Sequence, residues 1–499
     1  MSCSDLVEKN PGRIVELNTE EELAAALGES YTILGSWGGN AHIWSLHGVS
    51  TDEMVVPQRG QDWFTGGAWI EAHRHTWTVD HSRVINTWNF LFQGVNATSR
   101  LIEQFEFQIS EGADPSLVTP FISELRVLRG FYYFWLIDLF GNVPIIDRFA
   151  ETEQNPANNS NFQDGRNELF EFIENEILES IDTIQDDPRT NYGRMHKYAA
   201  HFLLAKLYLN AEVYSGSPRW QQVITHTNEI IDSGFFSLAS TYAENFAVNN
   251  SSSPEMIFVI PYDEVFLPGF NLHLMSLHYD QQSQFNFQDQ PWNGFATLQE
   301  FYESFEEDDS RKSGLMSGPQ YDLAGNPIID GVIGPNHQLN LTPEIPRLRM
   351  LDDLAVVSRE KGARFSKFEY EFGATSNMNN DFPIFRYTDV IMMKAEALWR
   401  LDSSDSEALM LINQIRERAN VEPFSTLNAD KFVSERGREF YLENWRRQDL
   451  IRFEGVAGGE TRFNDPWWEK DVSQSYRNVY PIPRPQIEAN PNLTQNPGY

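Results

Sequence analysis

The sequence has little cysteine, few basic residues and no long apolar run. Its one cysteine among 499 residues is Cys3, so the chain cannot form an internal disulfide or a cysteine-rich metal site. No stretch reaches the ~18 apolar residues that span a bilayer, and the densest apolar patch, residues 131–140, contains Asp138. The sequence also lacks a phosphate-binding loop, a dinucleotide glycine fingerprint, a His-Glu-x-x-His zinc motif and a Gly-x-Ser-x-Gly elbow.

The charge balance is strongly acidic, because 38 Lys and Arg face 72 Asp and Glu, giving a net charge of −34. This disfavours nucleic acid and anionic membrane surfaces as partners. A polyanionic glycan would also be repelled unless a local basic cleft offset the charge, and salt limits that repulsion to about 8–10 Å. With 41% apolar and 22% charged residues the composition is that of a globular protein.

Apolar residues at three- and four-residue spacing predict a mainly α-helical fold. The predicted helices cover residues 20–34, 84–104, 123–140, 168–185, 195–214, 220–234, 387–401, 406–419 and 433–453. Two helix pairs, 195–214 with 220–234 and 387–401 with 406–419, carry small residues such as Ala205 and Ala395 where helices would meet. Such pairs are typical of tetratricopeptide-like stacking.

Two regions do not read as helix. Residues 35–80 are rich in glycine and tryptophan, and residues 235–385 are rich in Gly, Asn, Asp, Pro and aromatics, with one strand-like run at 256–260. We therefore predict a helical scaffold over residues 19–234 and 386–455, with an irregular, ligand-bearing insert over residues 235–385. The two aromatic-rich loop regions are expected to converge in space and form a ligand-facing surface.

Aromatic side chains in loops, with polar side chains beside them, are typical of a sugar-binding site. Indole faces stack on sugar rings, and polar groups bind the hydroxyls. We predict Trp77 and Trp292 as stacking platforms and Asp62, Asn40 and Arg364 as hydroxyl ligands. Trp37 and Trp63 are weaker candidates of the same kind.

No catalytic residue, metal site or cofactor is predicted. Seventy-two carboxylates guarantee apparent pairs, so pairing carries no signal for a glycosidase. His73 and His75 lie two residues apart, and we expect packing or hydrogen bonding in the loop from them rather than metal binding.

Several short motifs, in order along nearly the whole chain, resemble the SusD/RagB family. They are Ser-Thr-Asp-Glu at 50–53, Arg-Gly-Gln-Asp-Trp at 59–63, Trp-Asn at 88–89 through Asn96, the segment 126–133, Phe-Gly-Asn-Val-Pro at 140–144, Pro-Trp-Asn-Gly-Phe at 291–295, Asp-Ser-Arg at 309–311, Phe-Arg-Tyr-Thr-Asp-Val at 385–390, Lys-Ala-Glu-Ala at 394–397, Arg-Gly-Arg-Glu-Phe at 436–440, Trp-Arg-Arg-Gln-Asp-Leu at 445–450 and Tyr-Pro-Ile-Pro at 480–483. Each piece is weak, but the ordered set is specific.

The resemblance implies an outer-membrane lipoprotein of a Gram-negative bacterium, which covers a TonB-dependent transporter of the SusC type. Cys3 then fits the acylated residue, residues 1–18 a tether and residues 19–499 a single SusD-like domain. No lipobox precedes Cys3, so we expect the natural chain to begin upstream; the alternative is an accidental free thiol.

The function we expect is non-catalytic capture of a polysaccharide or oligosaccharide at the cell surface for delivery to that transporter. The charge of −34 favours a neutral glycan such as a β-glucan. Two alternatives stay open: a glycoside hydrolase or lyase with paired carboxylates, and a peptide-binding tetratricopeptide scaffold. Neither the glycan linkage nor the transporter-facing surface is marked by any residue.

Overall fold

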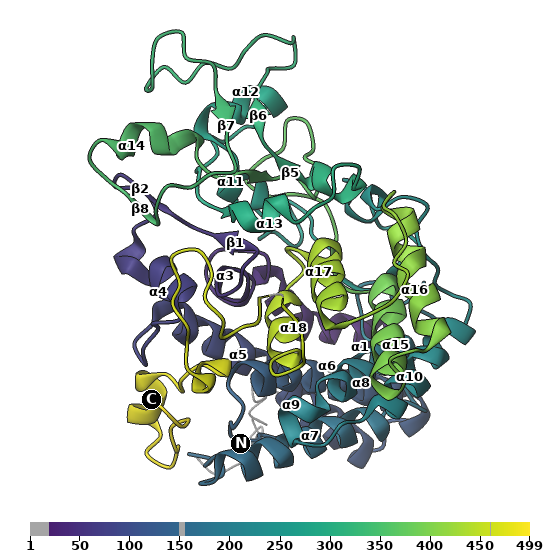
Figure 1. The fold of residues 1–499 in the computed structure, drawn as a ribbon. Helices are drawn as coiled ribbons and strands as arrows, with labels where there is room; N and C mark the ends of the chain where they lie inside the picture. The colour runs from purple at the N-terminus through teal and green to yellow at the C-terminus, as the bar shows by residue number, and fades with distance from the viewer. Residues whose placement is uncertain (1–18, 149–154, 460) are drawn as a thin grey trace, which may run out of the picture.

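The computed structural model describes residues 19–148, 155–459 and 461–499 (Figure 1). Cys3 and the predicted tether over residues 1–18 lie outside the described residues, so the division into a tether and one domain stays a prediction. The described chain is mainly helical with few short strands, which confirms the predicted fold class. None of its helices combines the length and the apolar composition that crossing a bilayer requires.

The N-terminal part is dominated by two long helices, α5 and α6, which pack along each other. Asp114 begins α6 by accepting the N–H of Ser116 at 2.9 Å, and Pro115 occupies the first turn, where no N–H is needed. The one helix predicted over residues 20–34 is divided near Gly28, a poor helix former. The elements are α1 (Glu20–Ala26), α2 (Gly28–Thr32), the 3₁₀ helix η1 (Ile33–Ser36), α3 (Ile43–Val49), β1 (Met54–Val55), β2 (Gln58–Arg59), η2 (Thr65–Gly67), α4 (Ala68–Arg74), α5 (Ser82–Ser110) and α6 (Pro115–Leu139).

The predicted helix pairs are present and stack on one another at the right of Figure 1. Helix α8 packs against α10, α10 against α15, and α15 against α16. Ala205 and Ala395 are fully buried, as close helix approach requires. These helices are α7 (Phe162–Leu178), α8 (Lys197–Leu209), α9 (Ala211–Ser215), α10 (Trp220–Asp232), α15 (Tyr387–Leu401) and α16 (Ser406–Arg418).

The insert consists of short elements joined by loops. They are η3 (Ala243–Phe246), β3 (Met256–Ile260), α11 (Leu272–Ser276), η4 (Tyr279–Gln281), α12 (Gln282–Phe285), β4 (Ala296–Thr297), α13 (Gln299–Glu303), η5 (Ser310–Gly314), β5 (Leu315–Met316), β6 (Gly318–Pro319), β7 (Asn340–Leu341), β8 (Arg349–Met350), α14 (Leu354–Val357), η6 (Ser358–Glu360), β9 (Arg364–Phe365) and β10 (Phe382–Arg386). The predicted strand at 256–260 is β3, which pairs antiparallel with β10.

Two small sheets join the N-terminal loop region to the insert. Strand β1 pairs antiparallel with β4, placing Met54 opposite Thr297, and β2 runs parallel to β8, placing Gln58 opposite Arg349. Because these pairs link segments more than 200 residues apart, they confirm that the two aromatic-rich regions converge.

The C-terminal part returns across the scaffold as α17 (Ala429–Phe440), α18 (Arg446–Arg452), η7 (Ser475–Asn478) and α19 (Arg484–Ala489). The single helix predicted over residues 433–453 is wrong, because Leu442 and Asn444 adopt left-handed backbone angles between α17 and α18.

Most tryptophans of the N-terminal loop region lie in the core. Trp37, Trp44, Trp69 and Trp77 are each at most 1% exposed, and the Trp77 indole N–H donates to the Tyr499 hydroxyl at 2.7 Å. A side chain without exposed surface offers no face to a sugar. The assignments of Trp37 and Trp77 as ligand platforms are therefore wrong.

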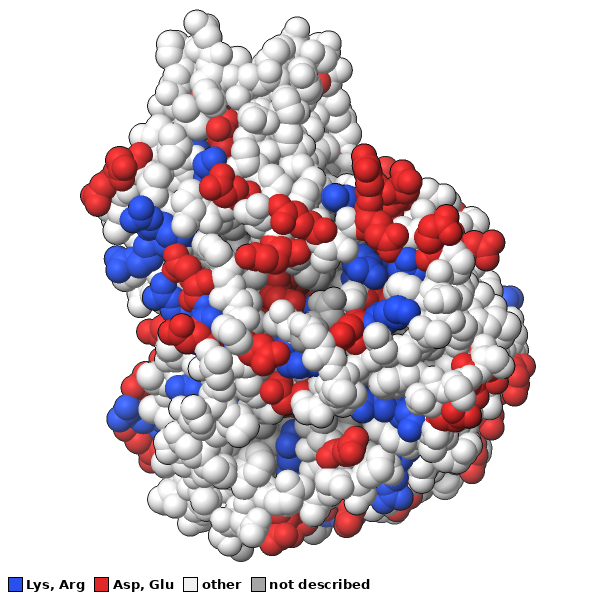
Figure 2. All heavy atoms as spheres, viewed as in Figure 1, with Lys and Arg blue, Asp and Glu red and all other residues white. Residues whose placement is uncertain are grey.

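Buried ion pairs also join the scaffold to the insert. Arg386 lies 2.6 Å from Glu443 and 3.1 Å from Glu255, and all three side chains are at most 1% exposed. On the face shown in Figure 2, the lobe that carries β6 and β7, at the tip of the insert, is nearly free of charged side chains.

Candidate functional site

Two half-buried tryptophans from distant loops lie side by side at the junction of β2 and the insert. The Trp63 indole N–H donates to the carbonyl oxygen of Trp292 at 2.7 Å, and the ring centroids are 6.5 Å apart with planes at 42°. Trp292 is one of the two predicted stacking platforms, and Trp63 is one of the weaker candidates. The structure brings both together.

The local backbone explains how Trp63 reaches this position. Arg59 and Asp62 exchange backbone hydrogen bonds of 3.1 and 2.9 Å around a tight turn, in which Gly60 has φ 61°. Trp63 itself has φ 60°, a conformation that costs energy for a bulky residue and is kept by its surroundings. Gly294 permits the contact, because a Cβ there would lie 2.3 Å from the Trp63 ring.

Two buried arginines hold these loops in place through hydrogen bonds. Arg59 donates to the carbonyl oxygens of Gly294 at 2.9 Å and Lys361 at 2.6 Å, and Arg364 donates to Asn293 Oδ1 at 2.6 Å. Burial lowers the pKa of the Arg59 guanidinium to about 10. Arg364 is 0% exposed, so its predicted role as a hydroxyl ligand is wrong and its function here is to hold the loop.

A carboxylate, a tyrosine and an arginine extend the aromatic pair. The Tyr279 hydroxyl donates to the exposed carboxylate of Asp62, another predicted site residue. The Arg359 guanidinium lies 4.6 Å from the centroid of the Tyr279 ring. Burial, with Asp62 beside it, raises the pKa of Tyr279 to about 12, so the hydroxyl stays protonated and keeps its hydrogen bond at neutral pH.

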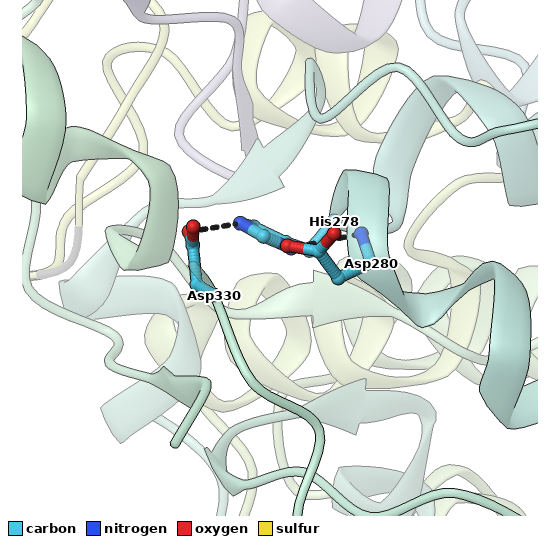
Figure 3. Close-up of side chains that lie close together, drawn as sticks. All are labelled: His278, Asp280 and Asp330. Atoms are coloured by element: carbon cyan, nitrogen blue, oxygen red, sulfur yellow. Dashed lines mark hydrogen bonds and ion pairs between the residues drawn. The ribbon is translucent and has the colours of Figure 1, made fainter. Parts of the chain in front are cut away.

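Arg359 is held in place by the acidic cluster drawn in Figure 3. Its Nε donates to Asp330 Oδ2 at 2.6 Å, and its Nη2 lies 3.4 Å from Asp280 Oδ2. The Asp330 carboxylate also faces the His278 ring, with 3.1 Å between Oδ2 and Nε2. His278 Nδ1 accepts the Asp280 amide N–H at 3.2 Å, which places the ring proton on Nε2, toward Asp330.

By donor type, His278, Asp280 and Asp330 could ligate a metal ion. Arg359, however, already pairs with both carboxylates and supplies the positive charge that a cation would bring. We therefore interpret the cluster as a support for Arg359 and assign no metal ion to it.

A cavity of about 350 Å³ adjoins Tyr279 and reaches the hairpin between β6 and β7. Gln282 and Gln290 contribute amides to its wall, and Ile329, which is 41% exposed, contributes apolar surface. Asp280 and Asp322 also line the cavity, and its ring face, amides and carboxylates suit a ligand with apolar faces and many hydroxyl groups.

The remaining predicted residues lie elsewhere. Asn40 is half-buried in the loop between η1 and α3, outside the hydrogen-bonded set around Trp63. His73 Nε2 contacts the Trp468 carbonyl oxygen at 2.7 Å, whereas the His75 ring lies between Ser50 and Ser473. The two histidines thus have separate partners, and they share no site.

The acid chemistry at this surface does not resemble a glycosidase. Burial raises the pKa of Asp330, but contacts with His278 and Arg359 outweigh it and keep that pKa below its ordinary value. A general acid needs the opposite shift. Glu53, whose pKa burial raises to about 8, is 1% exposed and beyond reach of a substrate.

Two family models match parts of this chain. A family model described as "SusD family" matches residues 361–499, and a second, "Starch-binding associating with outer membrane", matches residues 17–209. Among curated proteins, the chain is 27% identical over 428 residues to "Starch-binding protein SusD" of Bacteroides thetaiotaomicron, covering 76% of this chain and 72% of that protein.

Solved structures share the fold over nearly the whole chain. A SusD superfamily protein from Parabacteroides distasonis superposes with TM-score 0.77 at 21% identity, covering 97% of this chain and 100% of the other. Surface glycan-binding protein A from Bacteroides thetaiotaomicron, in complex with laminarihexaose, superposes with TM-score 0.75 at 21% identity, covering 96% and 99%.

Proposed function

The chain belongs to the SusD family, and from this premise we propose that it captures a neutral oligosaccharide at a surface formed by Trp63, Trp292, Tyr279, Asp62 and Arg359. The observation that carries the proposal is the contact between Trp63 and Trp292, which places two half-exposed indoles beside a carboxylate and an arginine. Indole faces bind the C–H faces of sugar rings, and the polar groups bind hydroxyls.

The ligand we propose is a neutral glycan such as a β-glucan. Support comes from the net charge of −34, which repels polyanions from most of the surface, and from the low charge of the lobe above the site (Figure 2). The structural relative bound to laminarihexaose, an oligosaccharide of β-linked glucose, favours the same class.

The binding is proposed to be non-catalytic. Relatives are named for binding starch or glycan and not for cleaving it. At the site, Asp62 accepts from Tyr279, and Asp330 is paired with Arg359, so neither carboxyl is poised as a proton donor.

The cellular setting follows the family description, which is association with the outer membrane. We propose that Cys3 is acylated, that residues 1–18 tether the protein to the cell surface, and that the captured glycan passes to a SusC-like TonB-dependent transporter. Two acyl chains would anchor a globule of this size stably, whereas one would not.

The test is affinity electrophoresis or calorimetry against laminarin, starch, fructan, alginate and a sulfated galactan, with the products assayed for new reducing ends. We expect saturable binding of a neutral glycan and no cleavage. Cleavage would make the protein an enzyme, and peptide binding without glycan binding would favour the tetratricopeptide-scaffold alternative.

The site itself is tested with Trp292→Ala. Loss of a central aromatic anchor costs about 2 kcal/mol or more, which corresponds to about 30-fold weaker binding. The matched control is Trp399→Phe, since Trp399 is a half-buried tryptophan on the scaffold helix α15. Equal effects of the two variants on affinity would contradict the assignment.

A further inference from the structure

A second cavity, of about 510 Å³, lies between the end of α4 and the segment 467–477, and it shares no lining residue with the cavity beside Tyr279. Its walls include Arg74, Lys470 and Arg477 as cations but only Glu469 and Asp471 as carboxylates. In a chain with 34 excess negative charges, a cavity with an excess of positive charge calls for an explanation.

The first cation is placed by a tight turn. Trp467 and Lys470 exchange backbone hydrogen bonds of 3.2 and 2.9 Å, with Glu469 in the left-handed region between them at φ 52°. This turn folds the Lys470 side chain back over the Trp467 ring, with its ammonium nitrogen 3.9 Å from the centroid. The turn therefore fixes a cation against an aromatic wall of the cavity.

The Lys470 ammonium is buried, and Asp465, Glu454 and Asp471 lie near enough to favour its charge without forming an ion pair with it. Lys470 is 3% exposed, and its Nζ donates to the backbone carbonyl oxygens of Asp465 at 2.7 Å and Asp471 at 3.3 Å. Among the described residues no carboxylate forms an ion pair with it. Burial lowers the pKa of Lys470 to about 8, which leaves the group mostly protonated at neutral pH. A buried charge that is only partly compensated favours binding of a counter-ion.

Arg477 repeats the pattern on the opposite wall. Its Nη1 donates to the Trp77 carbonyl oxygen at 2.5 Å, and its guanidinium lies 4.8 Å from the Tyr476 ring centroid and 5.1 Å from that of Tyr499. Within the described chain Arg477 has no carboxylate partner. A guanidinium held by ring faces and one carbonyl keeps donors free for an anion.

The nearby Glu469 is not available to neutralise these cations. One of its oxygens lies 2.5 Å from Arg74, and the other accepts the Leu348 backbone N–H at 3.0 Å. The cavity is thus a local basic cleft in an acidic protein.

We propose that this cavity binds a saccharide unit that carries an anionic group, a carboxylate or a sulfate ester, with the anion on Lys470 and Arg477. Trp467 and Tyr476 supply ring faces for the sugar, and Thr76 and Gln474 supply hydroxyl and amide groups. The site is separate from the proposed neutral-glycan surface and does not depend on it. It fits glycans in which charged units are interspersed among neutral ones.

The test uses the full chain and titrates glucuronate, glucose and inorganic sulfate at low ionic strength, followed by saturation-transfer NMR. Glucuronate is expected to bind, and glucose is not expected to compete with it. Arg477→Gln should weaken glucuronate binding about tenfold or more, because one charge-assisted contact is lost. Lys470→Gln should do the same, and wild-type affinity should fall as the pH rises above about 8.

The matched control is Arg349→Gln, an exposed arginine outside the cavity, and it should leave glucuronate affinity unchanged. Thermal melts of each variant show whether Lys470→Gln still folds; if it does not, Arg477→Gln decides. Laminarihexaose binding should be the same in all of these variants, so failure here is distinguishable from failure of the neutral-glycan proposal.

Three results would overturn the proposal. One is equal binding of glucuronate and glucose. Another is an equal effect of Arg477→Gln and Arg349→Gln. The third is sulfate competing as well as glucuronate does, since the sugar ring would then add nothing and the cavity would be a simple anion site.

Discussion

The scaffold and the insert differ in the regularity of their elements and in the apolar surface that they expose. In the scaffold, helices bury paired charged side chains, as where Arg452 meets Glu396 and Asp449 with at most 1% exposure. In the insert, strands are mostly two residues long and apolar side chains reach solvent, as with Leu323 at 63% and Val332 at 62% exposure.

The two regions are therefore expected to contribute differently to stability and to ligand binding. Buried ion pairs specify one arrangement and penalise any change that leaves a charge alone. Short strands and loops bury little of their own, so the insert depends on the scaffold for its shape, and its exposed rings remain available to a ligand. Changes in the scaffold should therefore alter unfolding, and changes at the tryptophan pair should alter affinity.

The largest expected effect comes from Arg386→Met. The change removes a buried cation from Glu443 and Glu255 and leaves each with only one cationic partner among the described residues, Lys367 and Arg418, which should lower the free energy of unfolding by about 3–5 kcal/mol. Urea titration followed by circular dichroism measures it. Arg484→Met is the matched control, since the Arg484–Asp80 pair is more than half exposed on both sides and should contribute little. Similar urea midpoints for the two variants would contradict the greater contribution of the buried ion pairs to stability.

Glu53 lies at the seam of the two regions, and its substitution should give the next largest effect. Its side chain accepts the Leu442 N–H at 3.4 Å, and its carbonyl oxygen accepts from Thr297 at 2.8 Å. Burial raises the pKa of Glu53 from 4.5 to about 8. The neutral acid is favoured in the folded state, so this stabilisation is present below about pH 4.5 and is lost as the pH rises to about 8.

Glu53→Gln removes that dependence. The variant should match the wild type near pH 4.5 and exceed it at pH 8 by an amount on the order of a few kcal/mol, measured as urea midpoints across pH. Unchanged pH dependence in the variant would show that Glu53 ionises freely in the folded protein.

The smallest expected effect is that of Tyr279→Phe. Loss of one hydroxyl that donates to Asp62 costs about 0.5–1.5 kcal/mol, so the affinity for the neutral glycan should fall a few-fold while the urea midpoint stays constant. Calorimetry on the variant measures this, with Tyr321→Phe as control because Tyr321 is exposed on the hairpin. A loss as large as that of Trp292→Ala would mean that the hydroxyl, and not the ring pair, dominates binding.

The scaffold was more predictable from sequence than the site was. Helices α8, α10, α15 and α16 follow from apolar spacing, because a helix that packs on one face repeats that face every 3.6 residues. The break between α17 and α18 could not be seen, since it depends on left-handed angles at Leu442 and Asn444, residues that carry no strong turn signal together.

The sequence predicts the type of site, but the structure brings together only some of the predicted residues. Tryptophan in a glycine-rich loop looks the same whether it will be buried or exposed, so Trp37 and Trp77 could not be separated from Trp63. Tyr279 and Arg359 gave no local signal at all. They join the surface only because the fold brings Tyr279 to Asp62, 217 residues away.

The most direct test is a crystal structure of the protein with a hexasaccharide of whichever neutral glycan in the panel binds most tightly. The account predicts a sugar ring stacked on Trp292 or Trp63, with hydroxyls reaching Asp62 and Arg359. A hexasaccharide bound on the helix pairs of the scaffold, with both indoles uncovered, would contradict it.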